Sequence, residues 1–163
     1  AVWKSPPRGG ATGDGGSWAM NPRAPRSVSH EALMHRFIDR VINEGDYSVL
    51  TDLLHPDYVY RAPGQELHGV EAIRAVLEVY RSALPDLHVG VDDLVAAGDR
   101  VAIAFTLTGT HAGTLMGVEA TGKRVKVNGT LFSRLEGGRI VEEWEVIDQL
   151  SLLAQLGVVS LPG

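Results

Sequence analysis

The sequence has no cysteine, no cluster of basic residues and no long apolar stretch. The lack of cysteine excludes disulfides, thiolate zinc sites and a cysteine nucleophile. With a formal net charge of −5 and no basic run, neither nucleic acid nor an anionic membrane is an expected partner. No apolar stretch approaches the roughly 20 residues that span a bilayer. These absences fit a cytoplasmic protein, which is the location that we expect.

The length and composition favour one folded domain preceded by a leader. The chain has 163 residues, of which 44% are apolar, enough for one domain with a sizeable core. Residues 1–27 hold five glycines and four prolines and show little apolar periodicity. They also lack the apolar middle region of a signal peptide. We therefore expect a flexible leader over residues 1–27, either native or preceding a start at Met20, and a domain over residues 28–163.

Three segments carry apolar residues three and four positions apart, the spacing of a helix with one buried face. The first predicted helix covers residues 30–44 and follows Ser29, whose hydroxyl can cap it. A short second helix is expected over residues 47–54. The third begins after Gly69 and stops at Pro85, because proline cannot continue a helix.

Most of the remaining sequence predicts strands. Apolar and polar residues alternate there, and turn residues such as glycine and aspartate separate the segments. A short apolar helix follows the last strand and ends at Gly157. Helices followed by antiparallel strands indicate an α+β fold. The predicted strands cover residues 58–62, 87–96, 100–110, 123–135 and 139–148.

The last predicted strand is crowded with carboxylates. Glu142, Glu143, Glu145 and Asp148 lie within seven residues. Because side chains alternate along a strand, Glu143 and Glu145 share one face, and Glu142 shares the other with Trp144. At least one carboxylate must therefore lie on the covered face of the sheet. A covered carboxylate is either paired or has a raised pKa, and such groups are candidates for acid/base chemistry.

Seven short motifs follow one another between residues 55 and 157. They are His-Pro-Asp-Tyr (55–58), Gly-Val-Glu-Ala-Ile (69–73), Pro-Asp-Leu (85–87), Gly-Asp-Arg-Val (98–101), Gly-Thr-His-Ala-Gly (109–113), Ala-Thr-Gly-Lys (120–123) and the closing segment 138–157, which contains Gly-Arg-Ile-Val-Glu-Glu-Trp, Asp148 and Gln-Leu-Gly. In this order they resemble the SnoaL-like polyketide cyclases, within the wider NTF2-like group. The resemblance covers about residues 29–157.

The resemblance implies an NTF2-like cone, in which a curved, mostly antiparallel sheet wraps around three N-terminal helices and a short C-terminal helix follows. It implies an apolar pocket, open at one end of the cone, that takes a hydrophobic small molecule. Members of the family commonly dimerise through the convex face of the sheet, so we expect a homodimer. Small residues on the predicted strand over 100–110 fit such an interface: Ala102, Ala104, Thr106 and Thr108.

The resemblance also implies a set of site residues. Cyclases of this family use an acidic residue on the last strand as acid/base for an intramolecular aldol closure, and that position falls on Glu145. Limonene epoxide hydrolase, a related enzyme, has a catalytic aspartate at the same point and a water-holding tyrosine at Tyr60. Glu145 and Tyr60 are therefore the implied catalytic residues, with Tyr60 as a donor to the substrate. The implied substrate-binding residues are Ile103, Phe105, Leu107, Leu131 and Glu143.

The partner residues of the related mechanisms are missing. Leu131 stands where the cyclases have a histidine, and Phe105 and Leu107 stand where the epoxide hydrolase has an arginine and a second aspartate. Ala62 replaces the aspartate of the ketosteroid isomerases. We expect a small cofactor-free enzyme of the cyclase or isomerase type that acts on a hydrophobic carbonyl compound. A binding protein without turnover is the alternative, and epoxide opening is a third hypothesis that needs an arginine near Glu145. No metal is expected, because the histidines show no zinc-like spacing with a carboxylate.

Simpler interpretations stay open for several of these side chains. Tyr60 could be a core aromatic with a satisfied hydroxyl. Asp148 could cap the C-terminal helix, because it directly precedes the first turn. His111 could be a solvated histidine of its loop. Glu145 itself could be exposed or could form a salt bridge with an arginine such as Arg61.

Overall fold

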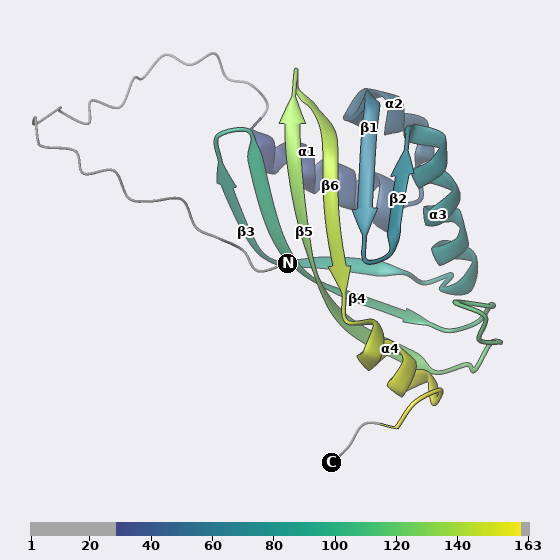
Figure 1. Cartoon of the computed structure of the whole chain (residues 1–163). Coiled ribbons are helices and arrows are strands. Elements are labelled where there is room, and N and C mark those ends of the chain that lie inside the picture. Colours follow the sequence, from purple (N-terminus) through teal and green to yellow (C-terminus); the bar gives the residue numbers. More distant parts are fainter. Residues whose placement is uncertain (1–28, 161–163) are drawn as a thin grey trace, which may run out of the picture.

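A six-stranded open sheet forms one layer of the fold, with its strands in the order β2-β1-β6-β5-β4-β3 (Figure 1). The computed structural model describes residues 29–160, so the predicted leader over 1–27 lies outside the described residues. Neighbouring strands are antiparallel except β1 and β6, which are parallel. The strands are β1 (Leu54–Ala62), β2 (Gln65–His68), β3 (His88–Ala97), β4 (Arg100–Thr110), β5 (Arg124–Glu136) and β6 (Arg139–Ile147).

The first predicted helix forms over the expected residues but changes type along its length. α1 (His30–Arg36) begins at Ser29, whose hydroxyl accepts a hydrogen bond from the Ala32 N–H at 3.2 Å. The chain then continues as a π-helix, η1 (Phe37–Asn43), whose wider hydrogen-bond spacing is common near functional sites. The other helices are the 3-10 helix η2 (Tyr47–Val49), α2 (Leu50–Leu53), α3 (Val70–Ala83) and α4 (Gln149–Leu156).

The chain around β1 differs from the prediction in two places. The short helix ends at Leu53, and the strand already begins at Leu54. Pro56 lies where the pairing between β1 and β6 shifts register, which is a place where a strand tolerates proline. β2 has no signal in the sequence, because Gln-Glu-Leu-His lacks a run of alternating apolar residues. It forms at the edge of the sheet by pairing back onto β1.

The core lies between the inner face of the sheet and the helices. α1 and η1 pack on β3 and β4, and α3 packs on β1 and β2 (Figure 1). On β4, Val101, Ile103 and Phe105 are buried, whereas Ala102 and Ala104 lie on the outer face. The predicted α+β layout with a curved, mostly antiparallel sheet is therefore confirmed. Among the helices of residues 29–160, none is both long and apolar enough to cross a membrane.

Candidate active site

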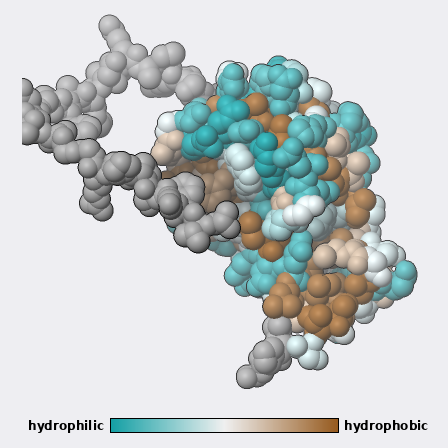
Figure 2. Space-filling view, viewed as in Figure 1, coloured by the Kyte–Doolittle hydropathy of each residue, from teal (hydrophilic) through white to brown (hydrophobic). Residues whose placement is uncertain are grey.

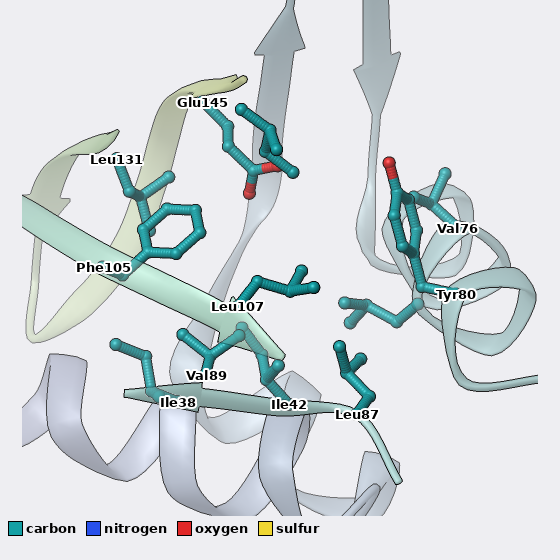
Figure 3. A pocket seen from close by; sticks show the side chains of 12 residues that line it. Ile38, Ile42, Val76, Tyr80, Leu87, Val89, Phe105, Leu107, Leu131 and Glu145 are labelled. Carbon is teal, nitrogen blue, oxygen red and sulfur yellow. The ribbon is translucent and has the colours of Figure 1, made fainter. Parts of the chain in front are cut away.

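An apolar cavity opens between the inner face of the sheet and the helices η1 and α3 (Figure 3). Its volume is about 60 Å³, which is room for several water molecules or for the reacting end of a larger ligand. Among its lining side chains within the described residues, those of Glu145 and Tyr80 carry polar atoms. The apolar lining residues are Ile38, Ile42, Val76, Leu77, Leu87, Val89, Phe105, Leu107, Leu131 and Ile147.

The alternation of side chains along β6 carries Glu145 into this cavity. Glu145 lies opposite Leu131 of β5, and Glu143 lies opposite Ser133. Trp144, between the two glutamates, points to the outer face and is 40% exposed. The assignment of faces from strand parity is therefore confirmed for these three residues.

Each inward glutamate of β6 is hydrogen-bonded by a tyrosine of β1. The Tyr60 hydroxyl donates to Glu145 Oε1 at 3.2 Å, and the Tyr58 hydroxyl donates to Glu143 Oε2. Ser133 Oγ adds a second hydrogen bond to Glu143, at 3.2 Å. The parallel pairing of β1 with β6 makes this repeat possible, because two tyrosines two residues apart face two glutamates two residues apart.

Burial dominates the electrostatics of both carboxyl groups. It raises the pKa of Glu145 from an ordinary value of 4.5 to about 7, and the hydrogen bond from Tyr60 partly opposes this rise. Burial likewise raises the pKa of Glu143 to about 7, opposed by hydrogen bonds from Tyr58 and Ser133 and reinforced by the charge of Glu145. Near neutral pH, each group can therefore lose or take up a proton, and the two ionisations influence each other.

The two glutamates differ in what can reach them. Glu143 is only 2% exposed and does not line the cavity. Glu145 is partly exposed and lines the cavity, with its carboxyl group directed into it (Figure 3). A ligand in the cavity would therefore contact Glu145, whereas Glu143 stays enclosed in the protein.

The predicted substrate-binding residues divide into two groups. Phe105, Leu107 and Leu131 line the cavity. Ile103 is on the same face of β4 as Phe105 but is buried in the core, and Glu143 is enclosed by Tyr58 and Ser133. Tyr60 is buried and directs its hydroxyl to Glu145, so that hydroxyl is already engaged before any substrate arrives.

Gly129 of β5 determines where the Phe105 ring can lie. The two residues are direct partners across the β4–β5 pair. A Cβ atom added at position 129 would lie 2.3 Å from the ring, closer than atoms can approach. The cavity wall formed by Phe105 therefore depends on the absence of a side chain at Gly129.

Other sequence-based interpretations are settled by the contacts. His111 is fully buried, with Nδ1 3.0 Å from the Thr121 hydroxyl, so the solvated interpretation is wrong. It is enclosed because the chain folds back there and Gly122 N–H bonds to the His111 carbonyl. The Asp148 carboxylate accepts a hydrogen bond from the Ser151 N–H at 2.9 Å, which confirms it as the cap of α4.

The arginines near β6 lie on the outer face. Arg134 bonds to Glu142 at 2.8 Å, and Arg61 bonds to Glu142 at 3.3 Å and to Glu66 at 2.8 Å. The interpretation of Glu145 as the partner of Arg61 in a salt bridge is therefore wrong. Strand parity explains the difference, because Glu142 and Glu145 project from opposite faces of β6.

The helical half of the cavity has no distinctive signal in the sequence. Ile38 and Ile42 come from η1, and Val76, Leu77 and Tyr80 come from α3. All have the spacing of core residues, and only the docking of the helices separates cavity-lining residues from filled core. Tyr80 is the residue whose chemistry matters most in this group, because it brings a hydroxyl into the apolar wall.

A comparison with the sequence profiles of protein families identifies the family. The sequence profile of the SnoaL-like polyketide cyclases matches residues 32–156. AclR, a proposed hydroxylase from Streptomyces galilaeus, is 32% identical, with 82% of this chain and 99% of AclR covered and a TM-score of 0.74. TsrD from Streptomyces laurentii is 33% identical, with 84% of this chain and 99% of TsrD covered and a TM-score of 0.74. IdmH, a proposed polyketide cyclase from Streptomyces antibioticus, is 31% identical, with 78% of this chain and 98% of IdmH covered and a TM-score of 0.69.

A comparison with curated proteins found no match. The profile match covers most of the chain, and the similarity to the solved structures extends over nearly their full length. The chain therefore belongs to the SnoaL-like polyketide cyclase family and has its NTF2-like α+β cone fold.

Proposed function

We propose that the protein is an acid/base enzyme of the cyclase or isomerase type, acting on a hydrophobic small molecule that bears a carbonyl group. One observation carries the proposal: the carboxyl group of Glu145 projects into a largely apolar cavity and has a pKa of about 7. A general base works best when its pKa lies near the working pH. The membership of the SnoaL-like polyketide cyclase family supports the same class of reaction.

In the proposed reaction, the Glu145 carboxylate takes a proton from the carbon next to a substrate carbonyl. The electron pair of that C–H bond forms a C=C double bond, and the carbonyl oxygen becomes an enolate oxygen. The enolate carbon then attacks a second carbonyl carbon of the same molecule, which forms the C–C bond of a ring. The new alkoxide takes the proton from Glu145, so the reaction is a net isomerisation.

Tyr60 has a supporting role in this scheme. Its hydroxyl donates to Glu145 at 3.2 Å and therefore fixes one oxygen of the carboxyl group that lines the cavity. The same bond favours the ionised carboxylate, because a hydrogen bond to the charged form lowers the pKa. We therefore assign Tyr60 to the positioning and tuning of Glu145.

A binding protein without turnover is the second candidate. The observation that favours it is the composition of the cavity wall: of the lining residues in the part of the chain that the structure describes, none is a second acid, a histidine, a lysine or an arginine. Such a wall suits a hydrophobic ligand whether or not a reaction follows. Epoxide opening by water lacks similar support, because Arg61 and Arg134 bind Glu142 on the outer face.

Exchange of α-protons for deuterium separates the two candidates. A small enolisable ketone, 2-tetralone, is incubated with the protein in D₂O, and its α-proton signals are followed by NMR. We expect exchange above the buffer rate, and a fall of about a hundredfold or more in Glu145→Gln, because general bases contribute about that factor. Glu142→Gln is the matched control, since it changes the neighbouring glutamate on the outer face. Unchanged exchange in Glu145→Gln would remove Glu145 from the mechanism, and binding without any exchange would favour the second candidate.

We also propose that two copies of the chain associate through the outer face of the sheet. Four residues form a continuous row across β3, β4, β5 and β6, because each pairs with the next: Val95, Ala102, Phe132 and Trp144. Phe132 is 57% exposed and Val95 61% exposed, which is unusual for large apolar side chains in a row. Further apolar surface gathers over α4 (Figure 2), where Leu150 is exposed. The small Ala102 leaves room for the partner's aromatic side chains.

A further inference from the structure

The Tyr80 hydroxyl is a polar group in the cavity wall, in addition to the Glu145 carboxyl group. The other tyrosine hydroxyls near the carboxyl groups are engaged, Tyr58 with Glu143 and Tyr60 with Glu145. Within residues 29–160, the Tyr80 hydroxyl forms no hydrogen bond. Tyr80 is half-buried, and its oxygen is not among the fully enclosed unpaired atoms of residues 29–160, so a ligand in the cavity can reach it.

The position of Tyr80 relative to Glu145 is well suited to a shared ligand. Tyr80 comes from α3, and its ring forms the wall of the cavity across from Glu145 (Figure 3). Val76 lies one helical turn before it and places the same face of α3 toward the cavity. Burial, together with the charge of Glu145, raises the pKa of the Tyr80 phenol, which therefore keeps its proton and stays a donor.

We propose that Tyr80 is a catalytic hydrogen-bond donor, which binds the substrate carbonyl oxygen while Glu145 takes the proton from the adjacent carbon. This inference rests on the proposed function. When the C–H electron pair moves toward oxygen, negative charge develops at the atom that the Tyr80 O–H contacts. A donor held in place in a largely apolar site stabilises such a charge better than a freely mobile donor in water does.

The proposal narrows the class of substrate. With a base on one wall and a donor on the other, the cavity selects a ketone on a flat, apolar group. The carbonyl oxygen of that ketone must reach Tyr80 while a proton on the adjacent carbon reaches Glu145. The remaining lining of the cavity contacts that group without further hydrogen bonds. The protein should therefore prefer an enolisable ketone to a hydrocarbon of the same shape.

Tyr80→Phe tests the inference, because it removes the hydroxyl and keeps the ring. Two measurements are made with the full chain: α-proton exchange of 2-tetralone, and the ratio of the affinities for 2-tetralone and tetralin, which lacks the oxygen. We expect the exchange rate to fall at least tenfold, since loss of one such donor costs about a hundredfold in known sites. We expect the preference for the ketone to fall about fivefold, the usual effect of one hydrogen bond, with the tetralin affinity unchanged.

Tyr47→Phe is the matched control, because Tyr47 does not line the cavity. The two readouts separate this inference from the proposed function. One outcome is that the wild-type protein exchanges no protons and the Tyr80→Phe variant prefers the ketone less than wild type does. The enzyme proposal then fails, and Tyr80 stands as a hydrogen-bond donor to the ligand. If Tyr80→Phe keeps both the wild-type exchange rate and the wild-type preference, Tyr80 only shapes the cavity and the inference is overturned.

Discussion

Replacing Glu143 with glutamine should make the protein less sensitive to rising pH. In the folded protein, Glu143 keeps its proton until about pH 7, whereas in the unfolded chain it loses the proton near its ordinary value of 4.5. Between these two values, each increase in pH favours the unfolded state, because only the unfolded state releases the proton. The contribution of Glu143 to stability is therefore complete below the ordinary pKa and is lost as the pH rises through about 7.

The size of the effect follows from the shift in pKa. One pKa unit corresponds to about 1.4 kcal/mol, so the rise from 4.5 to about 7 corresponds to about 3 kcal/mol. The total free energy of unfolding of a domain is about 5–15 kcal/mol, so this loss would be easily measured. Glutamine has nearly the same shape and no charge, and its amide can still bond to Tyr58 and Ser133.

Urea unfolding at a series of pH values, from about pH 4 to about pH 9, measures this contribution. The difference in the free energy of unfolding between Glu143→Gln and wild type should change by about 3 kcal/mol in favour of the variant across this range. Taking the difference cancels every titrating group that both proteins share. Parallel curves for the two proteins would refute the reasoning, because they would mean that Glu143 titrates alike in the folded and unfolded states. In a Glu145→Gln background the change should be smaller, since the charge of Glu145 contributes to the raised pKa of Glu143.

Two further predictions concern Tyr60 and the outer face of the sheet. Tyr60→Phe removes the hydrogen bond that favours the ionised Glu145, so the midpoint of the pH–rate profile for ketone exchange should move to higher pH, and an unmoved midpoint would contradict the tuning role. Phe132→Glu places a charge in the middle of the apolar row and should convert dimers to monomers at micromolar concentration, as measured by light scattering. Val79→Glu, which changes an exposed apolar residue on α3, is the control, and a wild-type protein that is already monomeric would count against the dimer.

Local patterns in the sequence predict the parts of the site that depend on strand parity. The period of two places Glu143 and Glu145 on one face and Trp144 on the other without knowledge of the other strands, and the family resemblance adds which face is the inner one. Asp148 as a helix cap is equally local, because the cap and the N–H that it binds are three residues apart. These features follow from geometry within one element.

The pairing of tyrosines with glutamates could not be predicted in the same way. Tyr58 and Glu143 are 85 residues apart, and their contact depends on the register of a parallel strand pair. The role of Tyr80 depends on how α3 docks, which an apolar stripe alone does not determine. The division between Ile103 in the core and Phe105 in the cavity wall depends on the same docking, since both are inward on β4.

The contact between Phe105 and Gly129 has a consequence for how substrate range could diverge in this fold. Gly129 does not line the cavity, yet any side chain there would force the Phe105 ring, which does line it, to move. A single methyl group added behind the wall would thus alter which molecules fit, while every residue that touches the ligand stayed the same. Two homologues could therefore share all their ligand-contacting residues and still accept substrates of different width, with the difference encoded at position 129.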